Sequence, residues 1–412
     1  MEYDVAVIGG GPAGMIAAGK AGESGSRVIL IEKNKSLGVK LLITGKGRCN
    51  LTNKVEESKE ITKKFGKNGK FLFSSLSKFG VNETIKFFKK NGLRTKIERG
   101  NRVFPTSDKS QDVLRTLSYY LRKFNVEMRT NSKVKKIVER GNNIRKIILS
   151  SGEEIIAKNF IICTGGMACP ITGCTGDGYR WVRKIGHTII DPSPALVPII
   201  VKDKYIGELE GLSLKNVEIS VYNNDKKIDS RFGEAIFTAN GMSGPIILDM
   251  SKRIGKELPG KIRIQIDFKP ALDSIKLDRR IQRDFEKSHN KLFKNSLNDL
   301  LPKKLIPTIV RLSKIDPNKK VNSITKEERT GLLHLLKGFS LEVKGLEGFK
   351  RAIITTGGIK LSEIDQKTMK SKLINNLYFA GEILNLDGPT GGYNLQACWT
   401  TGYVAGESAG HT

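Results

Sequence analysis

Short apolar runs alternate with glycine-rich polar segments in the first part of this chain and again at its end. Tyr3 to Ile8 is nearly continuous in apolar residues, as a parallel strand buried on both faces requires. A helix is predicted from Pro12, and Arg27 to Ile31 is predicted to be the second strand. Asn159 to Cys163 and Leu377 to Ala380 are further apolar runs that end at glycine-rich loops. The pattern predicts an α/β domain with a parallel sheet.

The pattern changes in the middle of the chain. Between roughly residues 195 and 270 it becomes short alternating strands separated by turns, such as Val217 to Tyr222 and Lys261 to Phe268, which predicts a barrel or sandwich. From Asp273 to Gly338 the apolar period is helical, with Pro302 at a helix start and a capping box over Thr325 to Glu328.

The first glycine-rich segment has the spacing of a dinucleotide-binding turn. Gly9 permits a tight turn, Gly11 lets the backbone approach a pyrophosphate, and Gly14 lets the helix pack closely on the strand. Phosphate oxygens would then meet free N–H groups at the helix end that contains Pro12 and Ala13. We therefore expect a dinucleotide site here.

Glu32 closes the second predicted strand, where a carboxylate can accept hydrogen bonds from both ribose hydroxyls. A carboxylate at this position repels a ribose 2′-phosphate, which argues against NADP in this pocket. FAD and NAD both remain compatible with Glu32.

The second glycine-rich segment favours FAD. Gly381, Glu382 and Asp387 lie in a loop after the apolar run, and Gly391 and Gly392 then open a helix. Reduced flavin carries negative charge at N1 and the C2 carbonyl, which a helix N-terminus would stabilise. The helix is predicted to contain Tyr393, Asn394, Leu395 and Gln396.

A third segment supports the flavin hypothesis. The strand to Cys163 ends in Thr164, Gly165 and Gly166, and Gly176-Asp177-Gly178-Tyr179 follows. This pattern resembles the middle motif of flavoproteins with two dinucleotides. Read alone, it is equally compatible with a plain strand-to-helix turn.

Together these motifs resemble the HI0933-like flavoprotein family over nearly the whole chain. Members of that family are described as aminoacetone oxidases and as bile-acid 3-oxo enone reductases. The resemblance rests on the segments already quoted and on Ile43-Thr-Gly-Lys-Gly-Arg-Cys-Asn-Leu-Thr-Asn53, Pro192-Ser-Pro-Ala-Leu-Val-Pro198, Gly241-Met-Ser-Gly-Pro245 and Thr356-Gly-Gly-Ile359.

The resemblance implies a discontinuous Rossmann-like FAD-binding domain with an inserted β-barrel and a small helical domain that caps the site. The expected bounds are 1–194 and 353–412 for the FAD domain, 195–271 with 339–352 for the barrel, and 272–338 for the helical domain. The resemblance also implies cofactor contacts from Lys33, Lys40, Arg48, Cys49, Asn50 and Val134.

This sequence departs from the family pattern on the substrate side. Ala239 stands where the family usually has a histidine, Asn385 replaces an aspartate, and Gly166-Met-Ala-Cys-Pro170 replaces Gly-Gly-x-Ser-Tyr-Pro. Tyr393 and Tyr179 are candidate proton donors and Cys49 is a candidate reactive group, each weighed against a packing role.

The other cysteines and the histidines suggest no further chemistry. Five cysteines without paired spacing fit a reducing compartment. Cys169 and Cys174 have the spacing of a redox disulfide, but such a disulfide belongs after the second strand. The four histidines lack metal-ligand spacing, so we propose no metal.

Composition adds a strong positive charge. The 412 residues are 38% hydrophobic, enough for two or three packed domains. No segment has the apolar length of a membrane span and no signal peptide is apparent, so we expect a cytoplasmic protein. The charge of +29 fits nucleic-acid binding, steering of an anionic substrate or NAD(P)H, or, as the favoured explanation, a lysine-rich surface without a specific partner.

The sequence predicts an FAD-dependent oxidoreductase that acts on a small molecule. There is no second complete glycine fingerprint, so NAD(P)H, if it is the electron donor, must dock transiently over the flavin. Reduction of an activated C=C or C=O bond is the main hypothesis. The alternatives are an oxygen-dependent amine oxidase and a flavoprotein that acts on or binds RNA.

Overall fold

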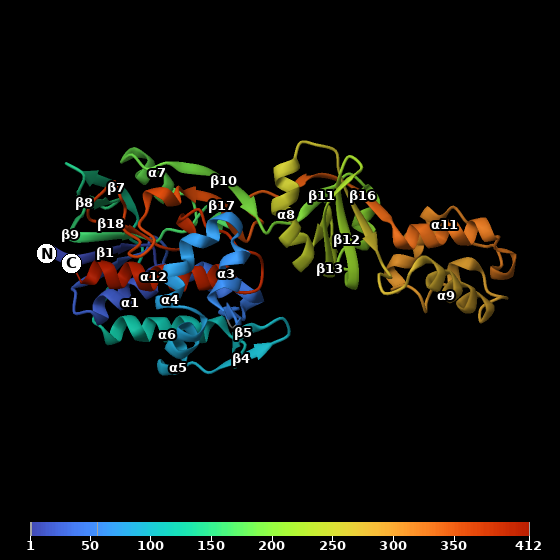
Figure 1. Ribbon diagram of the computed structural model, residues 1–412, viewed down its shortest axis with the longest axis horizontal. Helices are drawn as coiled ribbons and strands as arrows, with labels where there is room; N and C mark the ends of the chain where they lie inside the picture. The colour runs from blue at the N-terminus through green and yellow to red at the C-terminus, as the bar shows by residue number, and fades with distance from the viewer. Residues whose placement is uncertain (1, 56, 412) are drawn as a thin grey trace. The chain divides into compact units, whose positions relative to one another are not determined.

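The computed structural model describes residues 2–55 and 57–411, which form two compact units (Figure 1). Unit 1 contains Met1–Ala195 and Phe349–Thr412, and unit 2 contains Leu196–Gly348. Both ends of the chain therefore belong to one unit.

A parallel sheet organises unit 1. Strand β1 (Glu2–Ile8) pairs in parallel with β2 (Val28–Ile31) on one side and with β9 (Glu154–Ile162) on the other. The C-terminal segment adds β18 (Leu377–Phe379) beside β9, and β6 (Glu127–Arg129) lies beside β2. A strand from each end of the chain thus enters the same sheet, which confirms the predicted Rossmann-like fold class.

An antiparallel extension and several shorter elements complete unit 1. Strands β7 (Val134–Glu139) and β8 (Ile144–Leu149) continue the sheet from β9. The hairpin strands β4 (Thr95–Glu98) and β5 (Arg102–Pro105) form a separate sheet with β3 (Thr52–Asn53). Unit 1 also contains the helices α2 (Val39–Ile43), α3 (Ser58–Lys64), α4 (Phe73–Lys78), α5 (Val81–Lys90), α6 (Ser110–Lys123) and α7 (Asp177–Lys184).

Helices α1 (Pro12–Glu23) and α12 (Tyr393–Gly410) pack side by side and parallel. Glycines on α12 allow this close approach, because a Cβ at Gly406 would lie 2.2 Å from the Ala17 carbonyl oxygen. The close contacts pair Gly402 with Ala13, Gly406 with Ala17 and Gly410 with Ala21.

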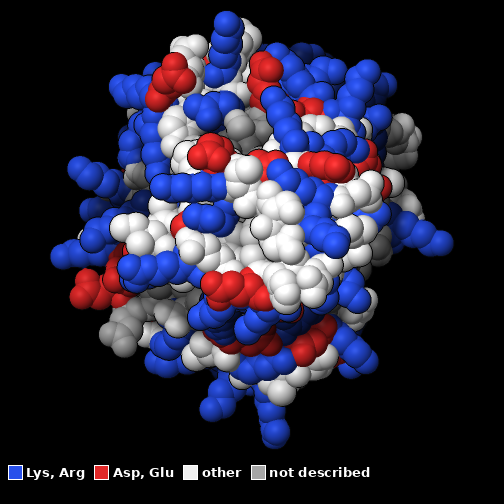
Figure 2. All heavy atoms as spheres, turned by 90° about the vertical axis from the view of Figure 1, so that its right-hand side faces the viewer, with Lys and Arg blue, Asp and Glu red and all other residues white. Residues whose placement is uncertain are grey.

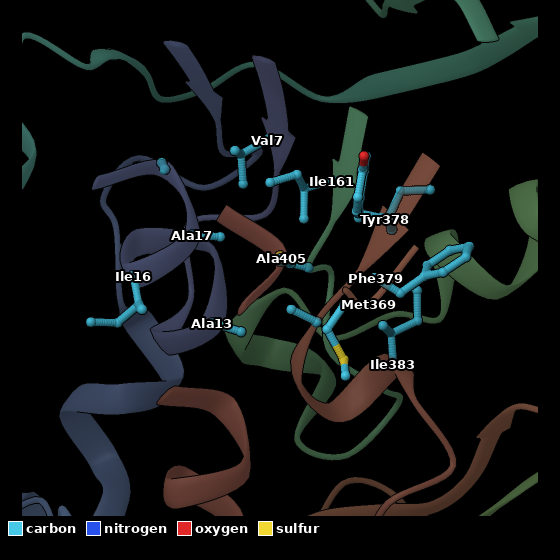
Figure 3. Close-up of a cluster of buried hydrophobic side chains, with 14 of the residues drawn as sticks. Val7, Ala13, Ile16, Ala17, Ile161, Met369, Tyr378, Phe379, Ile383 and Ala405 are labelled. Atoms are coloured by element: carbon cyan, nitrogen blue, oxygen red, sulfur yellow. The ribbon is translucent and has the colours of Figure 1, made fainter. Parts of the chain in front are cut away.

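The core of unit 1 lies between the sheet and these two helices (Figure 3). Val7 and Ile161 project from the neighbouring strands β1 and β9, and Ala17 and Ala405 meet them from the two helices. All four side chains are fully buried. Burial of each large apolar side chain contributes about 1.5–3 kcal/mol, so the strands and both helices are held together from opposite ends of the sequence.

Unit 2 contains a closed six-stranded barrel and a helical segment. Strand β12 (Ser213–Asn223) pairs with β13 (Lys226–Thr238) and with β15 (Ile262–Asp267). Strands β12 and β15 correspond to the two segments that the alternating pattern predicted as strands. The remaining barrel strands are β11 (Ile199–Val201), β14 (Gly241–Ser243) and β16 (Phe339–Leu346), and helix α8 is Pro245–Glu257.

The helical segment contains α9 (Ser274–Glu286), α10 (Ile306–Ser313) and α11 (Lys326–Lys337). The predicted capping box starts α11, since the Thr325 hydroxyl accepts from Glu328 N at 3.2 Å while Glu328 accepts from Thr325 N at 2.7 Å. Among the described residues, no helix has the length and apolar character needed to cross a membrane.

The chain passes between unit 1 and unit 2 twice, and a strand of unit 1 lies next to each crossing in the sequence. Strand β10 (Ile189–Ala195) leads toward unit 2, and β17 (Ile354–Ile359) follows the return. The two strands pair antiparallel, with a register shift between Ile190 and Ser193.

Candidate functional site

Three glycines at the start of α1 have different surroundings. Gly9 has φ +108°, and a Cβ there would lie 2.5 Å from the Cys163 carbonyl oxygen. A Cβ at Gly14 would lie 1.8 Å from the Gly9 carbonyl oxygen. Gly11 has no atom within 4 Å of a Cβ position. Packing therefore requires Gly9 and Gly14, whereas Gly11 leaves the backbone accessible to a ligand.

The N-terminus of α1 suits an anion. Gly11 is its N-cap, Pro12 and Ala13 begin the helix, and within residues 2–55 and 57–411 no side chain caps it. Free N–H groups and the helix dipole favour a phosphate at such a position. This local geometry fits the pyrophosphate of FAD.

Glu32 is 8% exposed and lies directly after β2. Its carboxylate accepts from Gly10 N and from Asn34 N, each at 2.7 Å. One oxygen is used by each N–H, so further acceptor capacity remains for ribose hydroxyls. Val134 is the first residue of β7 and lies close in the chain to Ser132, whose N–H donates to the Glu32 carbonyl at 2.8 Å.

Two of the predicted cofactor contacts, Lys33 and Asp177, form an ion pair with each other. The Lys33 ammonium donates to Asp177 at 2.7 Å and to the Thr175 hydroxyl at 2.6 Å, and Arg180 also pairs with Asp177. Burial opposes ionisation, but the hydrogen bonds from Lys33 and Thr175 outweigh it and lower the pKa of Asp177. The pair fastens the start of α7 to the end of β2.

The N-terminus of α12 is formed by the second glycine-rich segment, which was predicted to bind the flavin. Gly392 has φ +99°, and a Cβ there would lie 2.6 Å from the Thr52 carbonyl oxygen. No side chain in the described part of the chain caps this 18-residue helix. The Asn394 side chain instead holds the preceding loop, accepting from Gly388 N at 2.8 Å and donating to the Gly388 carbonyl at 2.9 Å.

The two helix N-termini face the same way. Because Gly402 is level with Ala13, Tyr393 begins α12 about eight residues ahead of the start of α1. At 1.5 Å per residue this is about 12 Å along the axis. A single ligand could therefore place a pyrophosphate at one N-terminus and an anionic ring at the other, joined by a ribityl chain.

The loop that precedes α12 packs on α1 and α12. Gly381 has φ +81°, a Cβ there would lie 2.8 Å from the Ala13 Cβ, and its N–H donates to the Thr401 hydroxyl at 2.9 Å. Glu382 pairs with Lys40 at 2.7 Å. Burial alone would lower the pKa of Lys40, but Glu382 outweighs it and raises that pKa.

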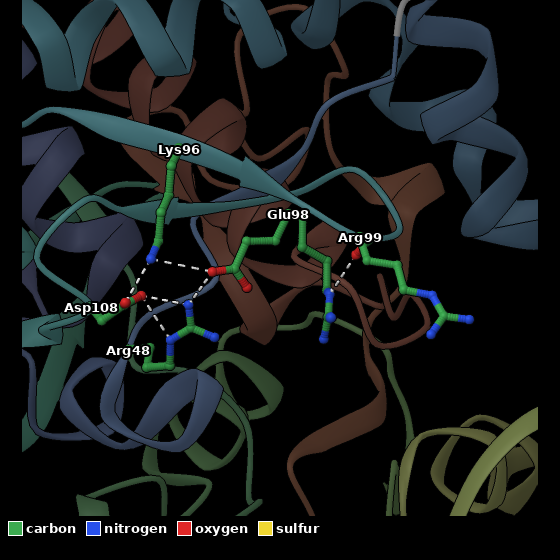
Figure 4. Close-up of polar contacts among 6 residues, drawn as sticks. Arg48, Lys96, Glu98, Arg99 and Asp108 are labelled. Carbon is green, nitrogen blue, oxygen red and sulfur yellow. Dashed lines mark hydrogen bonds and ion pairs between the residues drawn. The ribbon is translucent and has the colours of Figure 1, made fainter. Parts of the chain in front are cut away.

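Arg48 belongs to an ion-pair network with the β4–β5 hairpin (Figure 4). Its Nε donates to Asp108 at 2.8 Å, and its guanidinium also pairs with Glu98. Lys96 pairs with Asp108 at 2.6 Å, and the Phe104 ring lies 4.0 Å from the Arg48 guanidinium carbon. These contacts fasten the loop that contains Arg48 to the hairpin, so in this structure Arg48 holds its own loop in place.

Two buried polar atoms mark the same region. Asn50 Oδ1 and Thr164 Oγ1 have no hydrogen-bond partner among the described residues. Asn50 precedes Thr52, which lies against Gly392, and Thr164 lies against Gly178, where a Cβ would be 2.2 Å from its hydroxyl oxygen. Buried polar atoms normally have partners, so these two fit contacts with a polar ligand.

Gly165, Gly166 and Asp387 are placed by their neighbours. Gly165 has φ +68° beside Cys174, and a Cβ at Gly166 would lie 2.3 Å from the Thr355 hydroxyl oxygen. Asp387 accepts from the Thr356 hydroxyl at 2.8 Å. Thr356 belongs to the Thr356-Gly-Gly-Ile359 segment of the family resemblance, but neither Thr355 nor Thr356 was predicted to be a site residue.

Gln396 and Leu395 face the protein interior. Gln396 is 1% exposed, its Oε1 accepts from Thr52 at 2.6 Å, and its Nε2 donates to Thr84 and Thr400, each at 2.9 Å. Leu395 packs partly buried against the core of unit 1. Both residues thus support the position of α12.

Among the candidate catalytic groups, two are deeply buried. Burial raises the pKa of Cys49 to about 12, so its thiol stays protonated. Burial also raises the pKa of Tyr179, whose hydroxyl donates to the Glu382 carbonyl at 3.3 Å. Tyr393 is also buried, at 8% exposed, and it is the first residue of α12. Cys169 and Cys174 are both free thiols.

Comparison with known proteins identifies the family. The model of the HI0933-like protein Rossmann domain matches residues 3–408. The chain is 32% identical over 411 residues to the 3-dehydro-bile acid delta(4,6)-reductase of Clostridium scindens, covering 98% of each chain. It is 28% identical to the ribosomal RNA dihydrouridine synthase of Escherichia coli, again covering 98% of each.

A solved structure supports the fold. The 3-ketosteroid-delta4-(5alpha)-dehydrogenase of Rhodococcus jostii superposes with a TM-score of 0.55 at 16% identity, covering 99% of this chain and 97% of that one. Such low identity bears on the fold alone. With the family match over nearly its whole length, the chain belongs to the HI0933-like family and is an FAD-dependent oxidoreductase.

Proposed function

We propose that this enzyme reduces a C=C bond conjugated to a carbonyl group, with NAD(P)H as the electron donor. The observation that carries the proposal is the N-terminus of α12, which no side chain of the described residues caps; α12 runs parallel to α1 and begins about 12 Å ahead of it. Positive potential there favours negative charge on a reduced ring system.

The names of two relatives support the bond type. A 3-dehydro-bile acid delta(4,6)-reductase and a ribosomal RNA dihydrouridine synthase differ greatly in the size of their substrates. The chemistry in both names is nonetheless saturation of a C=C bond conjugated to a carbonyl, in a dienone and in a uracil ring. That shared bond is the substrate feature we transfer to this chain.

The residues have separate roles in this proposal. The α1 N-terminus at Gly11 would hold the pyrophosphate, and Glu32 would accept from ribose hydroxyls. The side-chain oxygens of Asn50 and Thr164, which have no partner among the described residues, would form hydrogen bonds with the cofactor. FAD, when bound, supplies hydride transfer from NAD(P)H to the substrate. Tyr393 is the candidate donor of the proton that completes reduction of the double bond.

The test is anaerobic mixing of the FAD-loaded enzyme with NADH, NADPH or a small amine. We expect a nicotinamide to bleach the flavin, and a conjugated enone to restore the yellow colour while gaining two hydrogens by mass. A saturated ketone is the matched control and should leave the flavin bleached. Bleaching by the amine, with peroxide released in air, would instead support an oxidase and contradict the reductase.

A second candidate substrate is a uridine in RNA, which the surface charge favours. Lys and Arg side chains cover much of the face that carries α9 and α11 (Figure 2). Basic surfaces attract polyanions, and neutralised phosphates make affinity fall steeply with salt. The exposed basic residues of this segment include Lys276, Arg279, Arg283, Lys287, Lys291 and Lys294.

The two candidate substrates can be separated with the same enzyme preparation. If RNA is the substrate, a ribosomal RNA fragment should reoxidise the bleached flavin, bind with strongly salt-dependent affinity and gain dihydrouridine. If RNA binds but neither reoxidises the flavin nor changes in mass, the charge serves only nonspecific binding and the RNA candidate fails.

A further inference from the structure

Strand β17 contains a threonine pair that contacts several parts of the cofactor site. Thr355 is fully buried, and its hydroxyl oxygen accepts from Met167 N at 2.8 Å and from Ala168 N at 3.0 Å. These N–H groups belong to the turn that follows Gly165 and Gly166. One side-chain oxygen therefore fixes the course of the turn after β9.

The same strand also reaches the C-terminal loop. The Thr355 N–H donates to Glu382 Oε1 at 2.8 Å, and the Thr356 hydroxyl donates to Asp387 at 2.8 Å. Glu382 uses its other oxygen to pair with Lys40. Thr355 and Thr356 thus connect two glycine-rich segments that are about 200 residues apart in sequence.

Two glycines keep the strand in this position. Gly357 and Gly358 have φ +91° and +121°. A Cβ at Gly357 would lie 2.5 Å from the Asp191 carbonyl oxygen, and one at Gly358 would lie 2.6 Å from the Ile383 carbonyl oxygen. Gly357 and Gly358 therefore leave no room for a side chain, while the two threonines before them bond to the middle and C-terminal motifs.

We propose that Thr355 and Thr356 are positioning residues for FAD. They act through the turn at Gly166, through Glu382 and through Asp387, and need no contact with the cofactor. The inference rests on the cofactor site described above. It gives the Thr-Thr-Gly-Gly segment a role as the strand that aligns the middle and C-terminal motifs.

The test compares valine and serine at each threonine. Thr355→Val keeps the shape but leaves Met167 N and Ala168 N without their acceptor, so the FAD dissociation constant should rise at least about tenfold. At saturating FAD, its flavin absorbance and fluorescence should move toward those of free FAD. Thr355→Ser keeps the hydroxyl and should restore both readouts to near the wild-type values.

Thr116→Val is the matched control. Thr116 is a largely buried threonine of the same unit, and its hydroxyl donates to the Asp112 carbonyl within α6. The control should lower the melting temperature without changing the flavin spectrum. If Thr355→Val does not fold, Thr356→Val decides, because Thr356 is only half-buried and its hydroxyl bond to Asp387 is the contact being tested. Thr356→Val should bind FAD about three- to tenfold more weakly.

Two results would overturn the proposal. One is a folded Thr355→Val or Thr356→Val protein with wild-type FAD affinity and spectrum. The other is a Thr355→Ser protein as impaired as Thr355→Val. A wild-type protein that does not bind FAD would instead refute the cofactor site itself.

Discussion

At the scale of single residues, Gly11 differs from Gly9 and Gly14 in the space around it. Side chains at Gly9 and Gly14 would overlap backbone atoms, whereas a side chain at Gly11 would occupy the approach to the α1 N-terminus. Gly11 also has φ −81°, which any L-residue can adopt. The three glycines should therefore respond differently to substitution.

We predict that Gly11→Val folds but binds FAD at least about a hundredfold more weakly, because the side chain fills the pyrophosphate position. Gly14→Val should instead yield little folded protein, since its Cβ would lie 1.8 Å from the Gly9 carbonyl oxygen. Circular dichroism and FAD titration of each variant check this. A Gly11→Val protein with normal FAD content would be inconsistent with the site.

His187 gives unit 1 a pH dependence. It is 2% exposed, its Nδ1 lies 3.2 Å from Glu363, and its Nε2 lies 2.9 Å from the Ser371 hydroxyl. Burial lowers the pKa of His187 below its ordinary value of 6.5, and Glu363 opposes this only in part. The ring is thus neutral at pH 7. Because the Glu363 carboxylate can only accept a hydrogen bond, Nδ1 carries the proton and Nε2 accepts from the Ser371 hydroxyl.

The sign of the pH effect follows from linkage. As pH falls below 6.5, the unfolded chain takes up a proton before the folded protein does, so the free energy of unfolding decreases. Urea denaturation at pH 7.5 and pH 5.5 should show this loss, and His187→Gln should show a smaller one. Equal losses in the two proteins would show that His187 is not the group responsible.

At the scale of elements, the α1–α12 interface sets the spacing of the two helix N-termini. We predict that Gly406→Val lowers the free energy of unfolding by about 1–3 kcal/mol or more, because its Cβ would lie 2.2 Å from the Ala17 carbonyl oxygen. Gly331→Val in α11 is the control, since no atom lies within 4 Å of its Cβ position. Similar melting temperatures for the two variants would contradict the close packing.

Much of this element pattern could be predicted from the sequence. The apolar runs at Tyr3 to Ile8 and Leu377 to Ala380 became β1 and β18, and the capping box at Thr325 starts α11. Boundaries were less accurate. Strand β9 begins at Glu154 rather than near Asn159, because its first half alternates between buried and exposed positions.

The contacts that hold the site together could not be predicted in the same way. Thr355 to Met167 and Arg48 to Asp108 join residues far apart in the chain, and no local period encodes such pairings. Gln396 was predicted to contact the cofactor, but its position in a glycine-rich motif gave no sign that three hydroxyl groups would surround its side chain. A sequence motif indicates which region forms the site, whereas the packing of the folded chain determines the partner of each side chain.

At the scale of the whole molecule, the site depends on both ends of the chain. Strand β18 and helix α12 come from the last part of the sequence and pack on β9 and α1. A ligand that contacts both segments should stabilise unit 1 by mass action, by about 2.7 kcal/mol at a hundredfold excess over its dissociation constant. Thermal melts with and without FAD check this, and an unchanged melting temperature at saturating FAD would contradict it.

We expect the N-termini of α1 and α12 to bind two parts of one molecule. Calorimetric titration of the apoprotein with FAD, FMN and ADP can check this, because FMN lacks the adenylate half and ADP lacks the flavin ring. We predict that FAD binds with one-to-one stoichiometry and at least about a hundredfold more tightly than either fragment. If FMN or ADP binds as tightly as FAD, one of the two helix N-termini contributes nothing and the expectation is wrong.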